Sequence, residues 1–234
     1  MVTKTLKTLL LITLCLNQVS ASNVLNRTMP VVKNGLVNST QVETKGEQKI
    51  LVVLVYDSSK NSPDDVYDKG QIEGYYFSDT EPSLKTYIKE VSNSKASVIG
   101  EVVDLVDVPD LCSVDVYDAA RRALDQIKDQ VSIENYDRFS FIMADDVSCD
   151  SDDSWTGKST LGKIYLSAEF PSVSISWIKS TKRIRLTINH NFGHNLGLRH
   201  DNANVSGTQV FNAEESPSME YGGAYSVMGS SSNL

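Results

Sequence analysis

The chain contains three histidines, and all of them fall in the segment 190–200, which reads His-Asn-Phe-Gly-His-Asn-Leu-Gly-Leu-Arg-His. His190 and His194 are four residues apart, so a helix would place both imidazoles on one face, one turn apart. Gly197 can adopt a positive φ and end that helix, and the chain can then return His200 to the same point in space. Three imidazole nitrogens that converge in this way suit one zinc ion, with a fourth position open for water.

The alternative is three ordinary histidines, in the core or on the surface, in a secreted structural or recognition domain without bound metal. For a lone histidine this is the better interpretation. Here no histidine lies outside the segment, and a glycine stands where the turn needs one. We therefore favour the metal site.

The pattern His-x-x-x-His-x-x-Gly-x-x-His resembles the zinc signature of the metzincin peptidases. Metzincins place a methionine turn beneath the metal, and Met228 follows His200 within the segment Tyr-Gly-Gly-Ala-Tyr-Ser-Val-Met-Gly. Residues 220–229 look most like the gametolysin family of metzincins, which are zinc endopeptidases associated with cell-wall and extracellular-matrix glycoproteins. The resemblance covers roughly residues 48–229.

This resemblance implies a metzincin-like zincin domain of the α/β (α+β) class, with a mixed twisted sheet, an active-site helix and a methionine turn. It implies that the three histidines bind one zinc ion and that Met228 packs beneath them without binding the metal. Asp201 follows the third histidine directly, a feature more familiar from adamalysin-type metzincins. We expect Asp201 to accept a hydrogen bond from an imidazole or a backbone N–H, with a solvated loop position as the alternative.

One position departs from the family's pattern. Active metzincins have Glu after the first histidine, and this chain has Asn191. The glutamate takes a proton from the zinc-bound water and delivers it to the leaving amine, whereas an amide cannot accept a proton. The loss of a general base typically costs a factor of about 10²–10⁴ in rate. Two hypotheses follow: a zinc metalloendopeptidase with impaired catalysis, and a zinc-binding pseudopeptidase that binds proteins or peptides.

The N-terminus has the pattern of a secretory signal peptide. Lys4 and Lys7 precede a short apolar stretch at 9–16, and small residues lead up to Ala21. The apolar stretch is too short to span a bilayer. We therefore assign residues 1–21 to a signal peptide and expect a secreted, extracellular protein that is not in the membrane after cleavage. The alternative is an uncleaved anchor or a buried helix.

Two further patterns fit secretion. Asn-x-Ser/Thr triplets begin at Asn26, Asn38 and Asn204, and such triplets are acceptors for N-glycosylation in secreted chains. Cys112 and Cys149 are the two cysteines that remain after signal cleavage. In an oxidising compartment they predict one disulfide, with two free buried thiols as the alternative.

Strands and helices alternate along the rest of the chain, which predicts a single domain. We assign residues 22–48 to an exposed lead-in or the remnant of a propeptide, and residues 49–234 to the domain. The expected strands lie at 50–56, 96–108, 139–144 and 161–168. The expected helices lie at 83–92, 115–131 and 185–196, and an acidic loop is expected at 57–73.

The resemblance also bears on the edge of the sheet and on the end of the chain. Residues 161–166 would resemble the edge strand that pairs with extended substrate in metzincins. Metzincins continue into a C-terminal helix after the methionine turn, and this sequence stops at Leu234. We therefore expect that helix to be missing.

Composition excludes several other classes of protein. Lys and Arg number 22 against 30 Asp and Glu, which gives a net charge of −8, and an acidic chain without basic clusters argues against nucleic-acid binding. The sequence has no phosphate-binding glycine loop and no serine nucleophile elbow. We expect a monomer that binds or cleaves an extracellular protein or peptide. A structural calcium ion near Asp64–Asp65 or Asp152–Asp153 is a second metal hypothesis.

Overall fold

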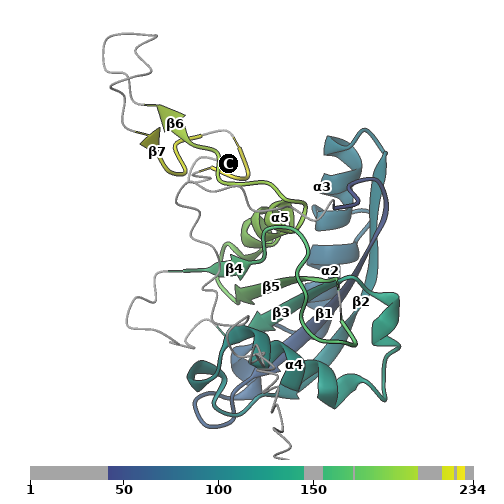
Figure 1. The fold of residues 1–234 in the computed structure, drawn as a ribbon, viewed down its shortest axis with the longest axis vertical. Helices are drawn as coiled ribbons and strands as arrows, with labels where there is room; N and C mark the ends of the chain where they lie inside the picture. The colour runs from purple at the N-terminus through teal and green to yellow at the C-terminus, as the bar shows by residue number, and fades with distance from the viewer. Residues whose placement is uncertain (1–41, 145–154, 171, 205–217, 224–225, 230–234) are drawn as a thin grey trace, which may run out of the picture. The chain divides into compact units, whose positions relative to one another are not determined.

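The uninterrupted apolar run at residues 50–56 belongs to an inner strand of a five-stranded sheet, seen in Figure 1. The computed structural model describes residues 42–144, 155–170, 172–204, 218–223 and 226–229. All of them belong to one unit of the chain, Leu36–Leu234. Strand β1 (Gly46–Tyr56) is buried along 50–55. Because helices cover both faces of this strand, its sequence is continuously apolar instead of alternating.

The sheet has the strand order β2-β1-β3-β5-β4. Its parallel strands are β1, β2 (Ala96–Asp107), β3 (Arg138–Met143) and β5 (Ser174–Lys179). The short strand β4 (Gly157–Ser159) pairs antiparallel with β5 and forms one edge. The domain therefore has a mixed sheet, and the site described below lies towards the β4 edge.

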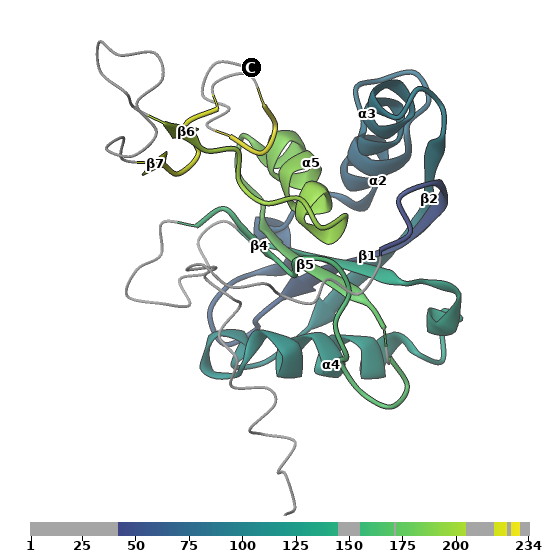
Figure 2. The same cartoon turned by 45° about the horizontal axis from the view of Figure 1, so that its top comes forward.

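Four α-helices pack on the two faces of this sheet among the described residues. Figure 2 shows α4 (Val116–Ile127) on one face, and α2 (Lys69–Phe77), α3 (Leu84–Val91) and α5 (Ile184–Asn195) on the other. Single 3₁₀ turns lie at Pro63–Asp65, Leu111–Ser113 and Ile133–Asn135. A two-stranded ribbon, β6 (Ala203–Asn204) with β7 (Ser218–Met219), follows α5. This arrangement confirms the predicted α/β class.

Most predicted elements are present, and some predictions are wrong. The strands at 50–56, 96–108 and 139–144 and the three predicted helices match β1, β2, β3, α3, α4 and α5 within a few residues. The strand predicted at 161–168 is wrong, because this segment forms only a single bridge, between Ile164 and Val173. Helix α2 occupies part of the predicted acidic loop, and β5 was not predicted at all.

The beginning of the domain is also visible. Strand β1 starts at Gly46, and the buried Gln48 belongs to it, so the sheet extends into the segment that we assigned to the lead-in. The predicted signal peptide at 1–21 and the end of the chain at 230–234, where the C-terminal helix was expected to be missing, lie outside the described residues. No helix in the described part of the chain is long and apolar enough to cross a membrane.

Candidate metal centre

Helix α5 carries the first two histidines on a face that turns away from the sheet. Its apolar residues recur every fourth position and are buried, which fixes the helix on the sheet. These residues are Ile184, Ile188 and Phe192. His190 and His194 lie one turn apart and are only partly buried. The same periodicity that packs the helix therefore leaves two imidazoles accessible on one side.

The helix ends in a glycine turn that brings the chain back towards the imidazoles. Gly197 has a φ of +89°, a conformation that glycine adopts without strain. Its N–H donates to His194 O at 2.8 Å, and the N–H of Leu198 donates to Gly193 O at 3.0 Å. This pair of bonds is a Schellman motif. Three residues after Gly197, His200 lies beside the other two rings.

The three imidazoles converge through their Nε2 atoms. The Nε2 atom of His194 lies 3.0 Å from that of His190 and 3.1 Å from that of His200. In the described part of the chain, these three residues are the only group of three metal-binding side chains whose ligand atoms come together. The sequence-predicted histidines therefore meet at one point.

The other nitrogen of each ring has a hydrogen-bond acceptor. His190 Nδ1 donates to Val227 O at 2.7 Å, and His194 Nδ1 donates to Leu198 O at 2.8 Å. His200 Nδ1 donates to Glu220 Oε1 at 2.7 Å. A carbonyl or carboxylate oxygen can only accept, so each Nδ1 carries the proton. The three Nε2 lone pairs are then directed at one another.

This arrangement fits a bound cation. Three lone pairs at such distances repel one another unless a positive ion lies between them. Two nitrogens at about 2.0–2.1 Å from a tetrahedral zinc would be separated by about 3.3 Å, close to the distances found. Imidazole ligands whose second nitrogen donates to a carbonyl or carboxylate are the usual environment of zinc in proteins.

The electrostatic environment favours the form of histidine that binds metal. Burial lowers the pKa of His194 to about 4, and it also lowers the pKa of His190. A hydrogen bond from each ring to a backbone carbonyl opposes this shift only in part. Both rings are therefore neutral at pH 7, which is the form that a metal ion requires.

The methionine turn packs against α5, the helix that carries His190 and His194. Met228 is buried, and its Sδ atom lies where a side chain at Gly193 would project: a Cβ there would come within 2.4 Å of it. The preceding residue, Val227, supplies the carbonyl that holds His190. The turn thus orients one imidazole and supports the helix beneath it.

Asp201 lies in this turn region and fixes the backbone. Its N–H donates to Met228 O at 2.9 Å, and its carbonyl accepts from the N–H of Gly223 at 3.1 Å. The carboxylate that holds an imidazole is that of Glu220, which bonds His200. Asp201 therefore joins the two halves of the turn through its main chain.

Tyr221 is a site residue that sequence reasoning missed. Its ring centroid lies 3.7 Å from that of His200, and its φ is +61°. A tyrosine in this left-handed conformation is uncommon and is strained. The only signal in the sequence is its place next to Glu220, shortly before the methionine turn. Tyr221 thus packs on the face of the His200 ring, and Glu220 accepts the hydrogen bond from its Nδ1.

Asn191 points to the edge strand. It is 2% exposed, and its Nδ2 donates to Thr187 O at 2.8 Å. Gly157 of β4 lies against it, since a Cβ at that glycine would come within 2.2 Å of Asn191 Nδ2. The hydroxyl of Ser159 donates to Asn191 O at 3.2 Å. Asn191 therefore bonds β4 through its main-chain carbonyl, while its side-chain amide packs against Gly157 and bonds within α5.

The remaining predicted residues give less information. The backbone of Cys112 lies in the 3₁₀ turn Leu111–Ser113, and Cys149 lies outside the described residues, so the disulfide stays a prediction. Asn26 and Asn38 also lie outside them, and Asn204 is in β6. Asp65 caps its own 3₁₀ turn by accepting from the N–H of Ser62. The calcium hypothesis gains no support there, and Asp152–Asp153 are not among the described residues.

Comparisons with known proteins give matches to solved structures but none to a family model or a curated protein. The structure of metalloproteinase-II from Bacteroides fragilis is 18% identical, with a TM-score of 0.39, over 66% of this chain and 44% of that one. A chaperone–substrate complex is 17% identical, with a TM-score of 0.35, over 68% of this chain and 25% of that one.

The chain thus spans less than half of either matched structure. Likenesses of this strength assign neither a family nor an activity, and the gametolysin assignment finds no support in them. The chain itself forms a mixed α/β domain that presents three histidines able to bind one metal ion.

Proposed function

We propose that this chain is a secreted, zinc-binding protein of the metzincin type, most like the gametolysins, with hydrolytic power impaired by Asn191. Its expected ligands are extracellular or cell-wall proteins and peptides. The observation that carries the proposal is the convergence of three Nε2 atoms whose partner nitrogens all donate to oxygen. The signal-peptide pattern at residues 1–21 supports secretion.

His190, His194 and His200 would hold the ion. Zinc in such a site lowers the pKa of a bound water and polarises a carbonyl oxygen. The task left to the protein is to move a proton from that water to the leaving amine. Asn191 stands where the resemblance places the group for this task, and its amide cannot accept a proton.

A second candidate function is a pseudopeptidase that binds zinc and peptides without cleaving them. The specific observation that favours it is the position of the Asn191 amide, which is buried and donates to Thr187 O. A carboxylate in the same position would face that carbonyl oxygen and be repelled by it. The local structure is therefore adapted to an amide, which supports the loss of proton transfer at this position.

The test is hydrolysis of casein by zinc-loaded residues 22–234, with the zinc content measured on the same samples. Wild type, a chelated sample and Asn191→Glu are compared. The matched control is Asn189→Glu, which makes the same chemical change on α5 at a residue that lines the groove towards α3.

Cleavage by Asn191→Glu alone would establish the pseudopeptidase, with a rate at least about 10²-fold above wild type if the general base is what is missing. Slow cleavage by wild type that chelation stops would support the impaired peptidase. Equal rates for wild type, Asn191→Glu and Asn189→Glu would refute the role given to Asn191. Wild type without bound zinc would refute the metal site itself.

A further inference from the structure

A buried arginine lies between the sheet and α5. Arg138 begins β3 and is 1% exposed. An arginine side chain stays charged in proteins, and an isolated buried charge is costly. No carboxylate in the described part of the chain forms an ion pair with it, and the neighbouring Asp137 bonds Lys163. Besides the nearby charge of Asp137, which favours the charged guanidinium, Arg138 therefore depends on hydrogen bonds.

Its guanidinium is surrounded by neutral oxygen acceptors from three parts of the chain. Nη1 donates to Ser174 Oγ at 3.2 Å and to Asn195 O at 3.3 Å. Nη2 donates to Gln48 Oε1 at 2.5 Å and to Glu43 O at 3.3 Å. Arg138 thus forms hydrogen bonds with β5, with the end of α5 and with the N-terminal segment 43–48.

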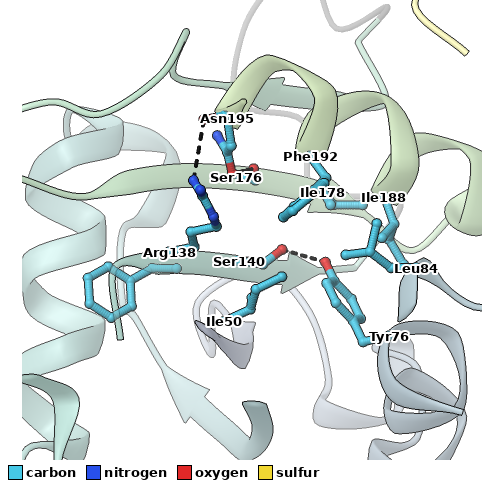
Figure 3. Close-up of a pocket in the computed structure, with 11 residues that line it drawn as sticks. Ile50, Tyr76, Leu84, Arg138, Ser140, Ser176, Ile178, Ile188, Phe192 and Asn195 are labelled. Carbon is cyan, nitrogen blue, oxygen red and sulfur yellow. Dashed lines mark hydrogen bonds between the residues drawn. The ribbon is translucent and has the colours of Figure 1, made fainter. Parts of the chain in front are cut away.

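The contact with Asn195 reaches the metal centre. Asn195 is the last residue of α5 and directly follows His194. The last carbonyl groups of a helix lack partners inside it, and a cation is favourable at this end. Figure 3 shows Arg138 bonded to Asn195 on the buried side of the helix. The arginine therefore satisfies an unpaired carbonyl in the turn that carries a metal-binding imidazole.

Further bonds hold the same residue against the sheet. Asn195 Oδ1 accepts from Ser176 Oγ at 3.0 Å, and Asn195 Nδ2 donates to Thr160 O at 3.2 Å. The end of α5 is thus held by its main chain and its side chain. Because His194 adjoins Asn195, a shift of this turn would move His194 Nε2 relative to the other two rings.

A small cavity with a mainly apolar lining adjoins these hydrogen bonds. It lies between the sheet and α5, is lined by Arg138, Ser140 and Ser176 among others, and has a volume of about 10 Å³. This volume suits one water molecule. Arg138 Nε, which makes no hydrogen bond to protein, is also buried.

We infer that Arg138 is a positioning residue for the metal centre. It fixes the last turn of α5 from the side opposite the imidazoles, and it makes this turn depend on the segment 43–48. The inference rests on metal binding by the three histidines. It adds that the geometry of His194 is set in part by a charge that contacts no ligand of the metal.

The test uses Co²⁺ affinity, the visible spectrum of bound Co²⁺, and hydrogen exchange in the metal-free protein. Arg138→Met removes the charge and all the guanidinium donors and leaves a shorter, unbranched apolar side chain. We expect it to weaken Co²⁺ binding at least about tenfold, the size seen when groups behind metal ligands are removed. We also expect faster exchange at the amides of Gly197 and Leu198. Arg122→Met, at an exposed arginine of α4, is the matched control and should change neither.

A second variant covers the case in which Arg138→Met does not fold. Gln48→Met keeps the arginine and removes one of its acceptors, far from the metal. Faster exchange in the last turn of α5 with weaker Co²⁺ binding would support the inference. A wild-type spectrum, affinity and exchange rate in Gln48→Met, or in a folded Arg138→Met, would overturn it. Wild type that fails to bind Co²⁺ would instead refute the metal site, while the exchange measurement would still decide the role of Arg138.

Discussion

Asp57 shows at the scale of one residue how a buried charge is stabilised. It follows β1, is fully buried, and accepts hydrogen bonds from the Ser59 hydroxyl and from the N–H groups of Ser59, Asp110 and Leu111. Burial by itself would raise the pKa of this carboxyl, but the four hydrogen bonds outweigh it, so the pKa lies below its ordinary value of 3.8. The folded state therefore prefers the ionised form.

This preference gives a pH-dependent prediction. Because the pKa is lower in the folded than in the unfolded chain, the stabilisation is complete above about pH 4 and is lost as the pH falls through the folded value. We expect Asp57→Asn to lower the free energy of unfolding by about 2 kcal/mol at pH 7, with a smaller difference below pH 4. Urea unfolding of both proteins from pH 7 to pH 3 measures this. Asp125→Asn, at an exposed helix position, should change stability by less than about 0.5 kcal/mol. A difference that stays constant over this pH range would contradict the argument.

At the residue scale, the histidines of the candidate site could be predicted from the sequence, and the residues that position them could not. The spacing of His190, His194 and His200 and the turn at Gly197 follow from helix geometry alone. Glu220 was one of several acids near the motif in sequence, and nothing in the pattern selects it as the partner of His200. Arg138 gave no signal, because its acceptors are main-chain and side-chain oxygens that only the folded chain brings together.

At the scale of elements, the contact between α5 and the edge strand β4 depends on a glycine. A Cβ at Gly157 would come within 2.2 Å of Asn191 Nδ2 and within 2.7 Å of Thr187 Cγ2. Asn191 cannot turn away without losing its bond to Thr187 O. We expect Gly157→Ala to destabilise the protein by about 1–3 kcal/mol through overpacking.

The matched control for this prediction is Gly74→Ala. Gly74 lies inside α2, and a Cβ there meets no atom within 4 Å. Alanine favours the helix, so this substitution should stabilise the protein by about 0.5–1 kcal/mol. Thermal unfolding of both variants beside wild type checks the pair. Equal effects of the two substitutions would contradict a tight contact between Gly157 and Asn191.

The elements that sequence reasoning missed are those without a regular apolar pattern. Strand β5 reads Ser-Ile-Ser-Trp-Ile-Lys and is buried throughout. Ser174 and Ser176 face Arg138 and Asn195 and bond to them, so the apolar pattern of a core strand is absent. Helix α2 contains two glycines and has no clear apolar stripe. By contrast, β1 has an uninterrupted apolar run and α4 has apolar residues at helical spacing, and these patterns were sufficient.

At the scale of the whole molecule, the metal site joins segments that are distant in sequence. Two ligands come from α5, the third from the turn after it, and their acceptors come from Leu198, Glu220 and Val227. Without an ion, the three Nε2 atoms oppose one another and the segments around 200 and 220–228 lose a common attachment. A bound metal would therefore stabilise the fold as well as the site.

The size of this stabilisation depends on the free zinc concentration relative to Kd. Zinc that binds only the folded chain stabilises it by about 2.7 kcal/mol at a free concentration of a hundred times Kd. For a domain of this size that corresponds to a rise in Tm of about 5–11 °C. Calorimetry of residues 22–234 with zinc and with chelator measures the difference. His194→Ala should unfold at the same temperature with zinc and with chelator. The zinc site of this variant has lost one of its three histidines, and the remaining two bind zinc far more weakly. A zinc-dependent rise in His194→Ala equal to that of wild type would show that the ion binds elsewhere on the chain, and no rise in either protein would refute the three-histidine site.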